Sequence, residues 1–246
     1  MVIWTKRKNA VYFWYILQQY QYCWYYFFIP LPYIVIFPGE LINLSKVVSI
    51  ENEKENKAHF FAVSSDVYFN PYAKTIGLTK NSFETNLFVF LIGKLSPNAE
   101  IMKIPPGYEN ITTNEIADYN FMLMEQSQEI SKNSALKYLG LSKAKINISF
   151  GSLAGSSGSL MTTLEIINQL NYQDLIKGRK IAGTGELNKS GDVLSIGFVN
   201  QKVYTAEKNG VDIIIIPEAN RGNVSIQTQL KIIYVKNLPD AISKLK

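Results

Sequence analysis

A serine-bearing loop that leads directly into a helix is the stretch of this sequence best suited to chemistry. Residues 151–170, GSLAGSSGSLMTTLEIINQL, pass from Gly, Ser and Ala into an amphipathic helical pattern, with Ser157 where that helix begins. Glycines let the backbone turn sharply and present a side chain. The free N–H groups of a helix N-terminus favour developing negative charge. Ser157 is therefore a candidate nucleophile, and the alternative is a flexible Gly/Ser linker with a serine N-cap.

Two residues further along the chain could act on the same site. Thr184 lies in the run Gly183-Thr-Gly-Glu186, within a predicted hairpin, and Lys202 lies at the start of the helix that follows. The strand–loop–helix of Ser157 and the hairpin–helix of Lys202 can meet on one sheet. Ordinary alternatives stay open for both: a solvated helix lysine and a threonine that fills a strand position.

The composition narrows the classes of function. The chain has 246 residues, is 47% hydrophobic and carries a net charge of +5, which suits one large domain with or without an appendage. Residues 6–8 supply three of the positive charges, so no nucleic-acid partner is expected. Cys23 is the only cysteine and His59 the only histidine, so neither a disulfide nor a thiolate zinc site is expected. His59 is predicted to be a satisfied, partly buried strand residue, and we expect no metal and no cofactor.

The N-terminal segment predicts a membrane anchor. No charged residue occurs from Asn9 to Gly39, and the apolar stretch inside it is long enough to cross a bilayer. The basic residues that precede it predict a cytoplasmic N-terminus with the rest of the chain outside. An interfacial or buried helix is the alternative because the segment contains several glutamines and many Tyr and Trp residues. In that case the protein would be cytoplasmic.

The remaining pattern predicts alternating strands and helices over residues 39–246, with no linker that would divide them. Residues 82–93 could be either helix or strand, and residues 94–112 are rich in turn formers. The other predicted elements are strands at 33–37, 59–69, 144–150, 212–217 and 231–235, helices at 113–138, 157–170, 201–210 and 238–245, and a hairpin within 179–197 whose turn is Asn188–Gly191.

These motifs together resemble the proteolytic domain of the Lon family, whose nucleophile is a serine paired with a lysine. Ser157 matches that nucleophile, Thr184 in Thr-Gly-Glu matches the active-site threonine, and Lys202 falls on the catalytic lysine. Residues 212–220, DIIIIPEAN, match the family's buried strand ending in Pro and then Asn. The resemblance covers 145–220 most clearly and extends over 28–140. It implies an α/β (α+β) domain with mixed sheets and flanking helices.

The N-terminal anchor makes the chain similar to a membrane-anchored bacterial branch of the family in which a PDZ domain interrupts the Lon domain. Here the helix ending at Gly140 runs almost directly into the strand at Ala144, so no room remains for a PDZ insert or an ATPase module. The expected organisation is an anchor at 1–38 and a Lon-like proteolytic domain at 39–246, with the domain outside the cytoplasm.

The nucleophile loop departs from the family pattern Gly-Pro-Ser-Ala-Gly. Ser156 replaces the proline, Gly158 the alanine and Ser159 the second glycine, and Phe198 replaces one of the paired glycines near the lysine. Ser156 and Ser159 are therefore rival nucleophiles. Gly155, Ser156 and Gly158 are the candidates for shaping the loop that binds the oxyanion.

The resemblance implies an ATP-independent, membrane-anchored serine endopeptidase. Lys202 would be the base for Ser157, because burial lowers a lysine pKa, and Thr184 would orient the amine. The expected partners are protein or peptide substrates, the membrane, and further copies of the chain in a homo-oligomer. The alternative from another class is a catalytically silent Lon-like domain that binds peptides or acts as a scaffold in the cell envelope.

Overall fold

The computed structural model describes residues 31–51, 58–68, 85–106, 113–150, 155–171 and 174–246. The first half contains β1 (Tyr33–Asn43), η1 (Leu44–Lys46), β2 (Val48–Ile50), β3 (Phe61–Tyr68), α2 (Leu87–Leu95), β4 (Glu100–Lys103), α3 (Thr113–Leu139) and β5 (Ile146–Ile148). The second half contains α4 (Ser159–Leu170), β6 (Ile181–Gly183), β7 (Glu186–Leu187), β8 (Val193–Leu194), α5 (Val199–Lys208), β9 (Ile213–Pro217), η2 (Glu218–Asn223), β10 (Lys231–Val235) and α6 (Leu238–Leu245).

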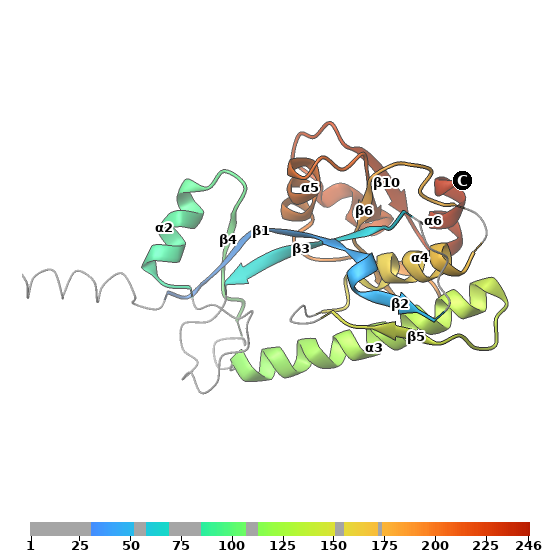
Figure 1. The fold of residues 1–246 in the computed structure, drawn as a ribbon. Helices are drawn as coiled ribbons and strands as arrows, with labels where there is room; N and C mark the ends of the chain where they lie inside the picture. The colour runs from blue at the N-terminus through green and yellow to red at the C-terminus, as the bar shows by residue number, and fades with distance from the viewer. Residues whose placement is uncertain (1–30, 52–57, 69–84, 107–112, 151–154, 172–173) are drawn as a thin grey trace, which may run out of the picture.

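A mixed six-stranded sheet organises the described residues, with strand order β10-β9-β6-β3-β1-β4 (Figure 1). The strands β10, β9, β6 and β3 run parallel, whereas β1 is antiparallel to both of its neighbours. Separate two-stranded pairs, β2 with β5 and β7 with β8, complete the strand pairing. The predicted α/β class with mixed sheets and flanking helices is confirmed.

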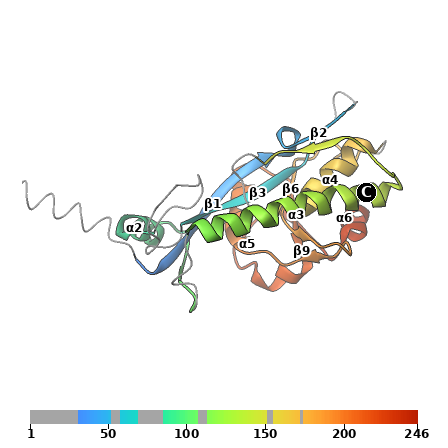
Figure 2. The same ribbon diagram turned by 90° about the horizontal axis from the view of Figure 1, so that it is seen from below.

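Helices cover both faces of the parallel part of the sheet. The strand Ile213–Pro217 shows the reason most clearly, because Ile213 and Ile215 join one core with α4 and α6, and Ile214 and Ile216 join another with α5. A strand buried on both faces reads as a continuous apolar run rather than an alternating one. The long helix α3 lies along α4 on the outer side of the first core (Figures 1 and 2).

The strand β1 is longer than the strand predicted at 33–37, because it continues through Pro38 and Gly39 to Asn43 as a bulged strand. Its register against β3 shifts between Pro38 and Leu41, which is a β-bulge. Proline cannot donate a ladder hydrogen bond and is accommodated at such irregularities. A Cβ on Gly39 would lie 2.5 Å from Ser64 Oγ and 2.7 Å from its backbone carbon, so only glycine allows this close approach.

Other differences from the sequence analysis are local. Residues 82–93, left open between helix and strand, contain the start of the helix α2, and β4 lies within residues 94–112, which are rich in turn formers. The predicted hairpin within 179–197 is split: β6 belongs to the large sheet, and only β7 and β8 pair across the predicted turn. The helix α5 begins at Val199, two residues before its predicted start.

The predicted membrane anchor falls largely on residues that the structure does not describe. Residues 1–30 lie outside the described ranges, and β1 crosses the expected boundary between positions 38 and 39. None of the helices within the described ranges has the length and hydropathy that a bilayer crossing requires.

Close packing around β6 leads to a first prediction on stability. A Cβ on Gly183 would lie 2.5 Å from Met161 Sδ and 2.8 Å from the backbone oxygen of Ile215, and the backbone oxygen has no room to move aside. We expect Gly183→Ala to lower the unfolding free energy by about 1–3 kcal/mol through overpacking. Urea denaturation would measure this loss. Gly222→Ala is the matched control because a Cβ there meets nothing within 4 Å, and equal midpoints for the two variants would contradict the prediction.

Candidate active site

The loop that carries Ser157 is held in place by the turn after β6. The Ser157 carbonyl oxygen accepts hydrogen bonds from Gly185 N–H at 2.7 Å and from Thr184 Oγ1 at 3.2 Å. In return, Leu160 N–H donates to the carbonyl of Gly185 at 3.1 Å. These reciprocal bonds fix the start of α4 against the Thr-Gly-Glu segment, so Ser157 has a defined backbone position rather than that of a flexible linker.

The three residues matched to the family's catalytic groups lie together. Lys202 Nζ is 3.1 Å from Ser157 Oγ and 3.3 Å from Thr184 Oγ1. Thr184 directs its own hydroxyl hydrogen to the Ser157 carbonyl, so towards Lys202 it can only accept. The amine therefore donates to Thr184 and, when neutral, has its lone pair available for the hydroxyl of Ser157.

The side chain of Lys202 is buried. Lys202 lies on α5 and is 4% exposed. None of the described carboxylates forms an ion pair with it. Burial penalises the charged ammonium and lowers the pKa of Lys202 to about 8. This residue is therefore not the solvated helix lysine of the alternative interpretation, and a usable fraction of it is neutral near pH 8.

Two structural features position the helix that carries Lys202. Phe198, directly before α5, has the left-handed backbone φ of 59°, which is uncommon for a residue other than glycine. Its ring packs against Ile34, Ile36 and Ile104 of a small core, which offsets this strain. The side chain of the buried Asn220 joins the preceding loop to η2, since Oδ1 accepts from Ile196 N–H and Nδ2 donates to its carbonyl, each at 2.9 Å.

The rival serines have other partners. Ser156 Oγ donates to Glu186 Oε2 at 2.5 Å. Ser159, 2% exposed, donates to the Ser156 carbonyl and accepts from Leu187 N–H, both at 2.8 Å. Only Ser157 among these serines contacts the lysine, although the three hydroxyls are close in sequence. Glu186 belongs to the Thr-Gly-Glu motif, but its sequence position did not indicate this contact with the Ser157 loop.

These contacts give different expected results for the rival serines. We expect Ser156→Ala to keep hydrolysis within about tenfold of wild type, because it loses a hydrogen bond to Glu186 but no contact with Lys202. Ser159→Ala should lower stability by about 1–3 kcal/mol, because it leaves the buried Leu187 N–H unpaired. Covalent labelling by a fluorophosphonate, with thermal melts in parallel, checks both. Loss of labelling in Ser156→Ala with an unchanged melting temperature would contradict this assignment.

The loop offers backbone donors beside Ser157. Gly155, whose φ of +99° is in the glycine-favoured region, donates its N–H to Asn120 on α3 at 3.3 Å. Among the described residues, none accepts from the N–H of Ser156 or Gly158. These groups lie next to the N-terminus of α4, where the helix dipole adds positive potential. Donors of this kind, free and preorganised, can stabilise an oxyanion.

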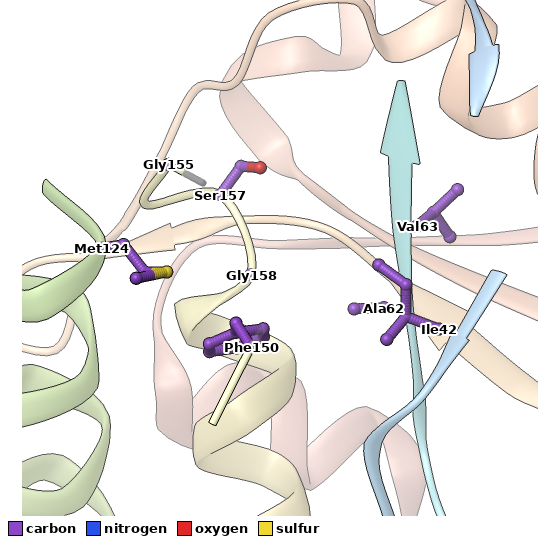
Figure 3. Close-up of a pocket in the computed structure, with 8 residues that line it drawn as sticks. All are labelled: Ile42, Ala62, Val63, Met124, Phe150, Gly155, Ser157 and Gly158. Atoms are coloured by element: carbon purple, nitrogen blue, oxygen red, sulfur yellow. The ribbon is translucent and has the colours of Figure 1, made fainter. Parts of the chain in front are cut away.

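A small apolar pocket lies next to the Ser157 side chain (Figure 3). Met124 approaches it from α3 and Phe150 from the segment after β5, on the side of the loop. The wall across from them comes from β1 and β3. The complete lining is Ile42, Ala62, Val63, Met124, Phe150, Gly155, Ser157 and Gly158.

His59 does not take part in this site. As predicted, it is partly buried and satisfied: Nδ1 lies 2.6 Å from Glu165 Oε1 on α4. The buried Glu165 carboxylate also accepts from Phe60 N–H at 2.8 Å and from Gln169 Nε2 at 2.6 Å. Within the described ranges, no group of three or more His, Cys, Asp or Glu side chains could hold a metal ion.

The part of the chain that holds Ser157, Thr184 and Lys202 matches a known protein family in sequence. Residues 153–245 match the Lon protease (S16) C-terminal proteolytic domain, so the Lon resemblance is confirmed over this segment. The chain is 37% identical over 94 residues to an archaeal Lon protease of Methanocaldococcus jannaschii, an alignment covering 38% of this chain and 14% of that protein. It is 26% identical over 211 residues to a Lon protease of Elusimicrobium minutum, covering 81% of this chain and 24% of that protein.

A third relative gives the same class. The chain is 32% identical over 133 residues to an archaeal Lon protease of Methanothermobacter thermautotrophicus, covering 49% of this chain and 20% of that protein. The chain thus spans between about a seventh and a quarter of the length of these curated relatives. The matches support a serine peptidase of the Lon type. The likeness to the PDZ-containing branch stays a prediction.

Proposed function

We propose that this protein is a serine endopeptidase that hydrolyses peptide bonds with a Ser157–Lys202 dyad. The observation that carries the proposal is the 3.1 Å contact between Ser157 Oγ and Lys202 Nζ. A serine hydroxyl is a weak nucleophile without an adjacent base. A lysine whose pKa is lowered to about 8 is a base that can act near neutral pH.

The reaction follows from these positions. The neutral amine of Lys202 takes the hydroxyl proton while Ser157 Oγ bonds to the carbonyl carbon of the scissile peptide. The resulting ammonium then returns that proton to the leaving amine as the C–N bond breaks, which leaves an acyl-enzyme. The same amine then takes a proton from water as its oxygen bonds to the ester carbon, and the ammonium returns that proton to Ser157 Oγ as the ester C–O bond breaks and the acid product leaves. Thr184 holds the amine by accepting one of its N–H hydrogens.

The loop residues supply the remaining transition-state contacts. The N–H groups of Ser156 and Gly158 would donate to the tetrahedral oxyanion, and Gly155 would shape the loop through its bond to α3. The pocket beside Ser157 is lined mainly by apolar side chains. It would therefore receive an apolar side chain of a protein or peptide substrate next to the cleaved bond.

The proposal includes how the protein is placed in the cell. The uncharged segment from Asn9 to Gly39 and the basic residues before it support a single-pass anchor with a cytoplasmic N-terminus and an extracytoplasmic domain. Hydrolysis would need no ATP and no cofactor, since every chemical step uses side chains of the site. We also propose that the protein forms a homo-oligomer, and this part is supported only by the resemblance to the Lon family.

The pH dependence of hydrolysis follows from the base. Because Lys202 must be neutral and its pKa is lowered to about 8, kcat/KM should rise with pH and level off above about pH 8 to 9. The measurement is the initial rate on a fluorogenic peptide with an apolar residue before the cleaved bond. A profile that is flat from about pH 6 to 10 would contradict a lysine base.

The function is tested with the full chain in detergent and without nucleotide. One sample is incubated with casein, and a separate sample is incubated with a fluorophosphonate. We expect casein fragments and one labelled serine per chain, mapped to Ser157 by mass spectrometry. A well-folded protein that neither cleaves nor becomes labelled would favour the catalytically silent, peptide-binding alternative. Cleavage only after addition of ATP would contradict ATP independence while leaving the dyad intact.

A further inference from the structure

The helix α2 has its apolar stripe on the outside. Its sequence, LFVFLIGKL, is almost wholly apolar, and its exposed large side chains are Phe88, Leu91, Ile92 and Leu95, with exposed fractions of 51%, 41%, 41% and 85%. These positions have the spacing i, i+3, i+4 and i+7, so they form one stripe along the helix. Surface helices of globular proteins place such a stripe on the core, and contiguous exposed apolar surface marks an interaction site.

The opposite face of α2 already has its partners. A Cβ on the buried Gly93 would lie 2.7 Å from Val35 Cγ1 and 3.1 Å from Ile101 Cδ1, so this face packs closely on β1 and β4. The ring of Phe90 lies 4.8 Å from that of Tyr33. The helix is thus fixed to the end of the sheet, and rotation about its axis cannot bury the exposed stripe.

The described part of the chain begins at Leu31, next to the start of α2. Leu31, the first described residue, donates its N–H to the carbonyl of Thr85 at 2.9 Å, just before the N-cap of α2 at Asn86. Residues 1–30 contain the uncharged apolar segment proposed as the anchor. An anchor that ends here brings α2 to the surface of the bilayer. In both views α2 lies at one end of the molecule, away from α4 and α6 (Figures 1 and 2).

We propose that the outer face of α2 is a membrane-docking surface whose partner is the interfacial region of the lipid bilayer. The proposal rests on the membrane anchor of the proposed function and adds to it an orientation. The stripe from Phe88 to Leu95 enters the headgroup–acyl boundary, and the exposed Lys94 beside it contacts anionic headgroups. Docking at this second point fixes how the domain, and with it the site at Ser157, is oriented relative to the bilayer.

A site-specific probe tests this on the full chain. Cys23 is the only cysteine, so Cys23→Ala gives a background for Leu95→Cys and for the control Lys189→Cys, each labelled with the fluorophore NBD. Lys189 is exposed in the turn between β7 and β8, which lies by α6 through the bridge between Asp192 and Asn237. The proteins are reconstituted into vesicles of phosphatidylcholine and phosphatidylglycerol, with or without lipids carrying a nitroxide near the headgroup.

The results separate the docking surface from the anchor. We expect both labelled proteins to float with the vesicles, a blue-shifted NBD emission at position 95 only, and at least about twofold stronger nitroxide quenching there than at position 189. Flotation with equal, aqueous signals at both positions would overturn the docking surface and leave the anchor standing. An emission at 95 that is blue-shifted but not quenched would overturn it in favour of a second copy of the chain. Failure to float would overturn the anchor itself.

Discussion

Ser157→Ala is expected to lower kcat/KM for peptide hydrolysis by at least about 1,000-fold, because it removes the atom that forms the acyl-enzyme. Lys202→Met should have an effect of the same order, because the hydroxyl then has no base. Lys202→Arg should not restore activity, since a guanidinium stays protonated. Initial rates on the same fluorogenic peptide, with circular dichroism to check folding, measure these losses.

The rate of the double variant at Ser157 and Lys202 tests whether the two residues act as one unit. Residues that act as one unit lose nearly all activity when either is removed, so the double variant should be no slower than the slower single variant. Thr184 acts through the amine, and Thr184→Ala should therefore cost less, about 10- to 100-fold, with Thr184→Ser recovering most of it. Hydrolysis that survives Ser157→Ala would point to Ser156 or to another nucleophile and would overturn the dyad.

Lys202→Met is expected to increase the stability of the protein at neutral pH while it removes activity. Burial lowers the pKa of Lys202 from 10.5 to about 8, which corresponds to a cost of about 3 kcal/mol for folding with the ammonium. Below about pH 8 both states bind the proton, so the full cost is present. Between about pH 8 and 10.5 the unfolded state binds more protons, so stability rises with pH until the cost is gone.

Urea unfolding at about pH 7 and about pH 10 tests this linkage. The stability advantage of Lys202→Met over wild type should be largest at the lower pH and nearly lost at the higher one. The matched control is Lys208→Met, an exposed lysine on the same helix, for which the difference from wild type should not change with pH. A Lys202→Met variant less stable than wild type at pH 7 would mean that the hydrogen bonds to Ser157 and Thr184 outweigh the desolvation of the ammonium.

Much of the fold follows from local patterns. The run Ile213–Ile216 predicts a strand buried on both faces, and the spacing of Leu160, Leu164 and Ile167 predicts α4 and its apolar face, because burial selects these residues whatever their partners are. The patterns fail where pairing outweighs local preference. The segment Glu100–Lys103 becomes a strand because it pairs with β1, and no periodicity over four residues could have predicted that.

Apolar periodicity, glycine-rich turns and motif order are local properties of the chain, and they were enough to predict the fold class, most elements and the set of candidate residues. Which of the serines lies against the lysine depends on contacts between segments that are far apart in the sequence. Ser156, Ser157 and Ser159 have the same side chain and lie within four positions of one another, and they differ in what the fold places around them: Glu186, Lys202 and Leu187. The lowered pKa of Lys202 also belongs to the tertiary structure, since it arises from the exclusion of water by elements that lie far apart in sequence.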